Sequence, residues 1–170
     1  LKQSLNTNWQ FYKGELDIQA VLENRVAEWQ KVNIPHTWNA RDMLDDTPGY
    51  YRGEAWYQKT FYLGEAYKDK SVHVFFEGAN QDAVVYMNEE KLGEHLGGYT
   101  AFCFDITPYV NREGKNILTL RLSNGHNPDV PPVGGDLGHF GGIYRDVFLI
   151  GVNQAHFDLN YFASNGIFIK

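Results

Sequence analysis

One loop of this 170-residue sequence gathers residue types that bind and orient polar ligands. The segment 127–142 carries Asp136, His139 and Phe140 among three prolines and five glycines. So many turn formers exclude regular structure over roughly fifteen residues. Long irregular segments in compact domains are usually functional or disordered. The charged and aromatic side chains favour a functional loop, because binding residues concentrate on loops held by a rigid scaffold.

Two pairs of adjacent carboxylates, Asp45–Asp46 and Glu89–Glu90, are candidates for general acid and base chemistry. Such chemistry requires two carboxyl groups that face one space. Adjacent residues in a strand point to opposite faces, and turn residues face water. Solvated loop charges are therefore the better interpretation of both pairs.

Other reactive residue types do not form a recognisable site. No histidine pair has the spacing of a zinc site, and the sequence has no nucleotide-binding loop and no Ser-His-Asp signature. The single cysteine, Cys103, lies in the apolar run 101–104, which indicates a buried small hydrophobe. No cofactor or metal is expected. The six histidines are scattered: His36, His73, His95, His126, His139 and His156.

The charge pattern excludes two classes of partner. The formal net charge is −6, and no run of Lys or Arg exceeds two residues. A nucleic-acid interface normally needs a basic face, and a membrane-surface patch needs a basic cluster. No apolar stretch approaches the ~20 residues of a membrane span. The first residues, Leu1–Ser4, show no signal-peptide pattern.

The elements that must position these loops are predicted to be short strands. Hydrophobic residues make up 43% of the chain and aromatic residues 15%, a composition that suits pleated, packed sheets. A weak helical spacing lies between Asp17 and Trp29. Many short strands separated by turn residues predict an all-β fold, a jelly-roll sandwich with long loops and little helix. The expected strands are 56–63, 72–76, 83–87, 101–106, 117–122 and 147–150, with a weaker candidate at 32–34.

Five segments resemble, in the same order, motifs of family 2 glycoside hydrolases. They are Val32–Asn39 (V-N-L-P-H-x-W in the family), Tyr51–Phe61 (Y-R-G-x-G-W-Y-R-K-x-F), Phe76–Gln81 (F-E-G-A-N-Q), Gly97–Thr107 (G-G-Y-T-x-F-x-F-D-I-T) and Phe140–Val147 (G-G-I-Y-R-D-V). Together they cover about residues 5 to 150. Two positions depart from the pattern: Glu89 stands in the family's Asn-Gly hairpin, and Ala55 replaces a common glycine.

The resemblance implies a domain organisation. Residues 1–153 would form the N-terminal sugar-binding jelly roll, and residues 154–170 would begin a following immunoglobulin-like domain. In the family, a TIM barrel further along the chain holds both catalytic glutamates. The fragment alone is therefore expected to be inactive, whereas the full-length protein would be a β-galactosidase that hydrolyses terminal β-galactosides in carbohydrate metabolism. β-Glucuronidase and β-mannosidase of the same family are the alternatives.

The resemblance also assigns substrate-binding residues. Asp136 matches an aspartate that, in the family's β-galactosidases, reaches the substrate's hydroxyl groups; otherwise it would bind its own backbone. Arg52 would line the same pocket, or else form an ion pair with Asp46 or Glu54. His139 and Tyr51 are expected at the rim.

Structural roles are expected for two other motif positions. His36 should hydrogen-bond within the turn 35–38, and the pair Arg145–Asp146 should tie its loop to the sheet, for example by a salt bridge.

Two other functions compete with that of a supporting domain. An autonomous carbohydrate-binding module would use aromatic side chains as a sugar platform and bind sugars alone. A pure interaction domain would use its faces for assembly. The expected partners are a carbohydrate substrate and the downstream domains, with homo-oligomerisation left open. Related enzymes of gut and soil bacteria are often exported, which favours the periplasm or cell surface.

Overall fold

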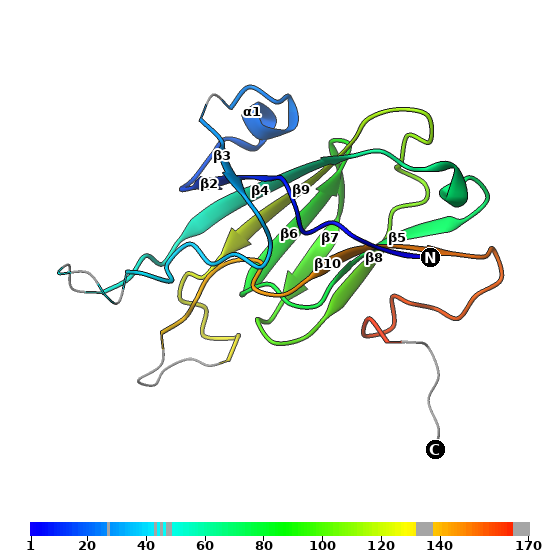
Figure 1. Ribbon diagram of the computed structural model, residues 1–170. Helices are drawn as coiled ribbons and strands as arrows, with labels where there is room; N and C mark the ends of the chain where they lie inside the picture. The colour runs from blue at the N-terminus through cyan, green and yellow to red at the C-terminus, as the bar shows by residue number, and fades with distance from the viewer. Residues whose placement is uncertain (27, 43, 45, 47–48, 132–137, 165–170) are drawn as a thin grey trace, which may run out of the picture.

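The chain folds as a sandwich of two antiparallel sheets, in a computed structural model that describes residues 1–26, 28–42, 44, 46, 49–131 and 138–164 (Figure 1). The four-stranded sheet has the order β1 (Lys2–Ser4), β10 (Val147–Val152), β5 (Ser71–Phe76) and β8 (Phe102–Asp105). The six-stranded sheet has the order β3 (Gln30–Val32), β2 (Trp9–Lys13), β4 (Glu54–Phe61), β9 (Asn116–Ser123), β6 (Asp82–Met87) and β7 (Glu90–Leu96). The predicted all-β sandwich is confirmed.

The core lies between the sheets and follows the period of two along each strand. In β9, Leu118, Leu120 and Leu122 are fully buried, and Val85 of β6 lies opposite Leu120. The other face of the six-stranded sheet is partly covered by the segment that carries α1 (Ile18–Leu22), where Val21 is buried. Asp17 begins this helix, because its carboxylate accepts a hydrogen bond from the Ala20 amide at 2.9 Å.

The strand predictions are confirmed for the six strong segments, whereas the weaker one at 32–34 shares only Val32 with β3. Strands β1, β2 and β7 were not predicted from the sequence. All three residues of β1 are exposed, and β7 has a glycine, Gly93, and alternates charged with partly buried side chains. Edge strands often carry such charged residues, which weaken the apolar signal of a strand. A single-turn 3-10 helix, η1 (Glu65–Tyr67), was also not predicted.

The segment after β10 lies against the sandwich as far as it is described. The His156 ring meets the ring of His73 in β5, with centroids 5.4 Å apart. Residues 160–163 form one wall of an open groove of about 800 Å³, with β7 and β8 on the other side. Cys103 lies in this groove; it is largely buried, and burial raises the pKa of its thiol to about 12. Within the described residues, no helix is long and apolar enough to cross a membrane.

The hairpin between β6 and β7 holds a glutamate in a backbone conformation that favours glycine. Asn88 has φ 47° and Glu89 has φ 76°. Two-residue hairpins of this kind need positive φ at both turn positions, and Asn-Gly is the preferred pair. A non-glycine residue with left-handed backbone costs roughly 1–2 kcal/mol.

We expect Glu89→Gly to stabilise the fold by about 0.5–1 kcal/mol, because relief of the left-handed conformation exceeds the extra chain entropy of glycine. Urea unfolding followed by tryptophan fluorescence measures the change. Glu90→Gly is the control, since Glu90 begins a strand and glycine there should cost about 0.5–1 kcal/mol. A loss of stability in Glu89→Gly would show that the Glu89 side chain contributes more than its backbone costs.

Candidate loop site at one end of the sandwich

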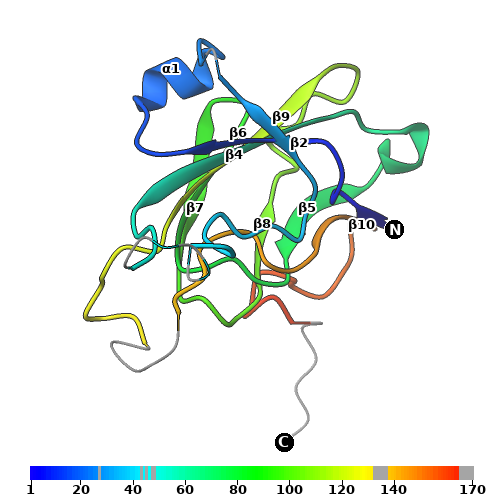
Figure 2. The ribbon, with the colours of Figure 1, turned by 60° about the vertical axis from the view of Figure 1, so that its left-hand side comes forward.

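Loops far apart in the sequence meet at one end of the sandwich. Figures 1 and 2 show the described residues around position 50 (cyan) and around position 130 (yellow) at the same end of the sandwich, beyond the strand ends. The backbone of Tyr51 and that of His139 accept hydrogen bonds from the same side chain, Asn124, at 3.1 and 2.9 Å. The structure therefore brings together three of the four predicted site residues: Tyr51, Arg52 and His139. The fourth, Asp136, lies outside the described residues.

Tyr51 is half-buried and both of its polar ends are bonded. Its hydroxyl donates to the Glu54 carbonyl at 2.9 Å, and its amide donates to the Asp42 carboxylate at 2.9 Å. Burial raises the pKa of the phenol, and the nearby carboxylates of Glu15 and Glu54 raise it further. Tyr51 thus shapes the loop through its own hydrogen bonds, and its hydroxyl is already committed to the protein.

Arg52 is exposed beside Tyr51. Its Nε donates to the Asn124 carbonyl at 3.1 Å. The proposed ion pairs with Asp46 and Glu54 do not form among the described residues; Glu54 instead lies 3.4 Å from Arg121. The two terminal amino groups of Arg52 have no hydrogen-bond partner among the described residues, so they can bind an anionic or hydroxylated ligand.

His139 is largely buried, and its backbone is held in place. Its carbonyl accepts hydrogen bonds from the amide groups of Asn39 and Asn124, both at 2.9 Å. A third asparagine, Asn80, donates to the Phe140 carbonyl at 2.6 Å and exchanges backbone hydrogen bonds with Gly142. The sequence does not mark these three asparagines as site residues, because an asparagine in a loop equally indicates a simple turn.

Two glycines let the 138–142 segment pack directly on the segment 36–38. A Cβ at Gly141 would lie 2.0 Å from Trp38 Cζ2, and one at Gly142 would lie 2.2 Å from the His36 carbonyl oxygen. The two segments also exchange backbone hydrogen bonds, from the Trp38 amide to the Gly141 carbonyl and from the His36 amide to the Ile143 carbonyl. This close approach of backbones explains why glycine stands at both positions.

Aromatic side chains from β2, β4 and the turn 35–38 support this segment from below. Phe11 meets the ring of His36 at 4.6 Å and that of Tyr57 at 4.9 Å between centroids. His36 Nδ1 lies 2.7 Å from the Tyr57 hydroxyl. The prediction that His36 bonds within its own turn was therefore wrong: its side chain reaches strand β4, because the turn folds back over the sheet.

Burial lowers the pKa of His36, and it also lowers those of His73 and His95. An unfolded histidine has a pKa of about 6.5. Below that pH the unfolded chain binds protons that the folded chain does not take up, so the unfolded state gains stability. We expect the free energy of unfolding to fall as the pH drops from 7.5 to 5.5.

Urea unfolding at several pH values checks this dependence. His73→Gln should reduce the slope, because it removes one of the three groups. His126→Gln, which replaces an exposed side chain, is the matched control and should keep the slope. A flat stability profile in the unsubstituted chain would contradict the assignment.

The pair Arg145–Asp146 joins its loop to the sandwich without an ion pair. The Asp146 carboxylate accepts a hydrogen bond from the Asn6 side chain at 2.9 Å, and Asn6 also accepts from the Val147 amide at 2.9 Å. Arg145 lies over the ring of Tyr144. Asp146 thus has the predicted structural role, but its partner is Asn6. Neither Arg145 nor Asp146 forms a salt bridge among the described residues.

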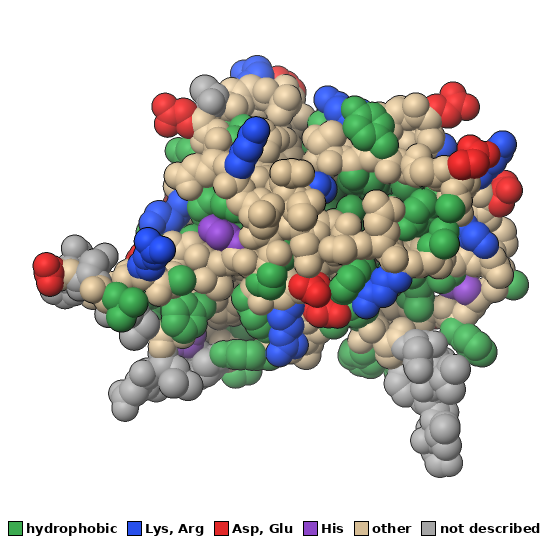
Figure 3. Space-filling model, viewed as in Figure 1, with side chains coloured by type: hydrophobic (Ala, Val, Ile, Leu, Met, Phe, Trp, Pro, Cys, Tyr) green, Lys and Arg blue, Asp and Glu red, His purple; other side chains and the backbone are tan. Residues whose placement is uncertain are grey.

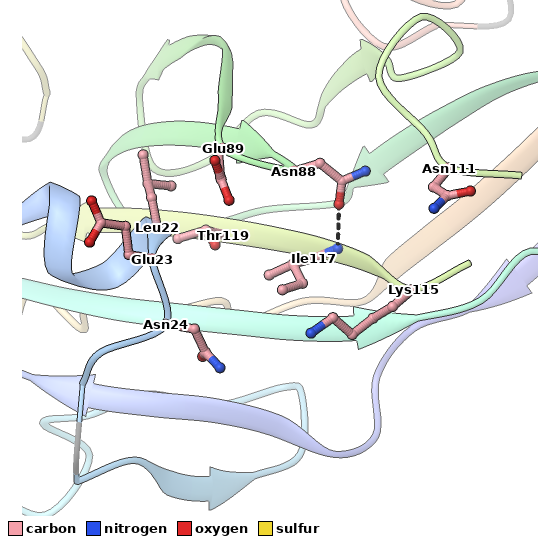
Figure 4. A pocket seen from close by; sticks show the side chains of 9 residues that line it. All are labelled: Leu22, Glu23, Asn24, Asn88, Glu89, Asn111, Lys115, Ile117 and Thr119. Carbon is pink, nitrogen blue, oxygen red and sulfur yellow. Dashed lines mark hydrogen bonds between the residues drawn. The ribbon is translucent and has the colours of Figure 1, made fainter. Parts of the chain in front are cut away.

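Cavities elsewhere on the molecule do not coincide with the loops. One of about 480 Å³ lies at the opposite end, between α1, the Asn88–Glu89 turn and the start of β9 (Figure 4). Its lining mixes polar side chains with Leu22 and Ile117, and its charged side chains are exposed. On the face seen in Figure 3, acidic and basic side chains are interspersed. No group of three His, Cys, Asp or Glu residues in the described ranges is placed to hold a metal ion.

Comparisons with known proteins identify the family of the chain. Residues 2–153 match the family model described as the sugar binding domain of glycosyl hydrolases family 2. A beta-glucuronidase of Bacteroides fragilis is 37% identical over 165 residues, which cover 97% of this chain and 23% of that protein. A beta-galactosidase of Thermoanaerobacter pseudethanolicus is 35% identical over 163 residues, covering 94% of this chain and 22% of that protein.

A solved structure of a similar protein has the same fold. Bacteroides uniformis beta-glucuronidase 2, covalently bound to cyclophellitol-6-carboxylate aziridine, superimposes with a TM-score of 0.89 at 36% identity. The match covers 97% of this chain and 19% of that chain. The chain thus spans about a fifth of the length of the relatives that it matches.

Proposed function

Because this chain belongs to glycosyl hydrolase family 2 as a sugar-binding domain, we propose that it supplies one wall of the active site of a longer β-glycosidase. The observation that carries the proposal is that the Tyr51–Gly53 and 138–142 loops meet at one end of the sandwich and share hydrogen-bond partners. Its relatives are about five times longer, which leaves room for the domains that hold the catalytic groups.

In this proposal the chain binds and orients the sugar, and the chemistry belongs to a barrel domain further along the polypeptide. Retaining glycosidases use two carboxylates about 5–5.5 Å apart, as nucleophile and acid/base. The domain would contribute Arg52 from one loop and Asp136 from the other, with His139 and Tyr51 at the rim. Residues 1–153 would be this domain, and residues 154–170 would begin the next one.

The first candidate substrate is a terminal β-galactoside. It rests on Asp136, whose place before the Gly-Ile-Tyr-Arg-Asp-Val motif matches the aspartate of β-galactosidases. A carboxylate can accept hydrogen bonds from two neighbouring sugar hydroxyls, and such charge-assisted bonds are strong and directional.

A terminal β-glucuronide is the second candidate, favoured by a specific observation. The exposed guanidinium of Arg52 keeps both terminal amino groups unbonded among the described residues. That fork matches the geometry of a uronate carboxylate. Relatives at 36–37% identity include enzymes named beta-glucuronidase.

Activity assays with matched nitrophenyl glycosides test the proposal. The full-length protein should cleave the β-galactoside or the β-glucuronide, and the ratio of the two kcat/KM values assigns the substrate. The 170-residue chain alone should cleave neither. Cleavage by the isolated chain, with contaminating hydrolases excluded, would overturn the assignment of catalysis to another domain.

Calorimetry on the isolated chain separates the supporting domain from an autonomous binding module. One wall of a pocket should bind galactose, glucuronic acid and mannose oligomers weakly or not at all. Saturable binding in the micromolar range would favour the autonomous module.

A further inference from the structure

We propose that Asn39 and Asn124 are positioning residues that join the Tyr51–Gly53 loop and the 138–142 loop into one rigid unit. The inference rests on the proposed function, since it concerns the loops that would meet the sugar. It assigns the two asparagines a task in presenting Arg52 and the segment that follows Asp136, without contact between either asparagine and the substrate.

Asn124 connects the two loops through three hydrogen bonds. Its amide nitrogen donates to the carbonyls of Tyr51 and His139, at 3.1 and 2.9 Å. Its amide oxygen accepts from the Gly53 amide at 2.9 Å. Its own backbone carbonyl accepts the Nε of Arg52, so the guanidinium is also held from this residue. One side chain therefore sets the spacing between the two loops.

Asn39 also connects the two loops through its side-chain amide. Its amide nitrogen donates to the His139 carbonyl at 2.9 Å, and the Tyr51 carbonyl lies 3.4 Å away. Its amide oxygen accepts from the Gly141 amide at 3.0 Å. The two asparagines thus converge on the same pair of carbonyls, those of Tyr51 and His139.

The side-chain amide is the group that suits these contacts. It offers two N–H donors and an acceptor oxygen, whereas a carboxylate has no donor for the two carbonyls. Asn39 is 1% exposed and Asn124 is 0% exposed. Hydrogen bonds in such a buried site are strong, and their loss leaves buried carbonyls and amides without partners. The backbone of both loops is therefore specified at four positions by two side chains.

These hydrogen bonds affect where the side chains that would meet the sugar are placed. Arg52 and His139 belong to loops with no regular structure of their own, and their positions relative to a bound sugar depend on this network. In metal sites, replacement of a residue that holds a ligating side chain in place typically costs 10- to 100-fold in affinity or activity, and we expect a loss of that size here.

The chain offers a matched control at the opposite end of the sandwich. Asn116 is 0% exposed, and its amide bonds the backbone of Asn111 in both directions, at 2.7 Å each. It also contacts the Asn88 side chain at 3.0 Å. Its replacement removes a comparable buried network far from the loops, so it measures the cost of lost stability alone.

The test compares Asn39→Ala, Asn124→Ala and Asn116→Ala in the full-length protein, with nitrophenyl β-galactoside and β-glucuronide as substrates. We expect kcat/KM to fall roughly 10- to 100-fold in the first two variants, mainly through KM, and less than about 2-fold in the third. All three are assayed where urea unfolding shows each protein to be folded. If an alanine variant does not fold, the comparison is made between Asn39→Ser and Asn116→Ser instead.

The outcomes separate this inference from the proposed function. A full-length protein that cleaves neither glycoside overturns the proposed function. An active protein in which Asn39 and Asn124 variants behave like the Asn116 variant overturns the positioning role. A loss confined to kcat, with KM unchanged, also contradicts it, because displaced binding loops must weaken substrate binding.

Discussion

Asp136→Ala in the full-length protein is expected to lower kcat/KM on the true substrate by about 100- to 1000-fold. Hydrogen bonds to a charged group contribute about 1.5–3 kcal/mol each, and a carboxylate that accepts two sugar hydroxyls would provide two of them. A loss of about 3–4 kcal/mol corresponds to two or three factors of ten. The kcat/KM of Asp136→Asn should lie between the values of the unsubstituted protein and of Asp136→Ala, since the amide keeps one acceptor but not the charge.

Asp129→Ala is the control for this prediction. Asp129 lies in the same loop, is exposed, and its backbone amide donates to the Asn127 side chain at 3.0 Å. Its replacement should change kcat/KM less than about 2-fold, in line with ordinary surface substitutions. If Asp129 and Asp136 variants lose activity equally, the loop acts through its overall charge or fold, and Asp136 has no individual contact with the sugar.

Gly142→Ala is expected to destabilise the chain by about 3 kcal/mol or more. Gly142 has φ +141°, a conformation that side-chain-bearing residues rarely adopt. The added methyl carbon would lie 2.2 Å from the His36 carbonyl oxygen and 3.0 Å from Thr37 Cα. Both are backbone atoms, so the two segments must separate, and the costs of strain and overpacking add.

Urea unfolding of the 170-residue chain, followed by the fluorescence of its four tryptophans, measures this loss. Gly64→Ala is the control: no heavy atom lies within 4 Å of a Cβ built there, and Gly64 has φ −76°. Its effect should stay within about 0.5 kcal/mol. Equal stability of the Gly142 variant and the unsubstituted chain would mean that the contact between segments 36–38 and 141–143 is looser than the geometry indicates.

The two substitutions separate binding from architecture. Asp136→Ala should leave the free energy of unfolding nearly unchanged, because the role proposed for Asp136 is a contact with the sugar. Gly142→Ala should lower both stability and activity, since the same backbone contact holds the segment that follows Asp136. A glycosidase that keeps its activity in both variants would refute the loop site as a whole.

The sequence by itself determined the class of fold and the family. The strand-forming residue types in 117–122 and 83–87, and the Gly and Asn turns between the strands, follow local rules of sheet and turn geometry. The order of five motifs, from Val32 to Val147, carried the family. These signals lie within short segments, so no knowledge of distant contacts was needed.

Only the tertiary structure decided which residues act together at the loop end. Asn39 and Asn124 are 85 positions apart, and neither has a sequence context that distinguishes it from a turn asparagine. Their hydrogen bonds to the carbonyls of Tyr51 and His139 exist because the sandwich brings four chain segments to one end. Side chain to backbone contacts of this kind depend on distances between segments, and a sequence pattern records residue types along the chain but not those distances.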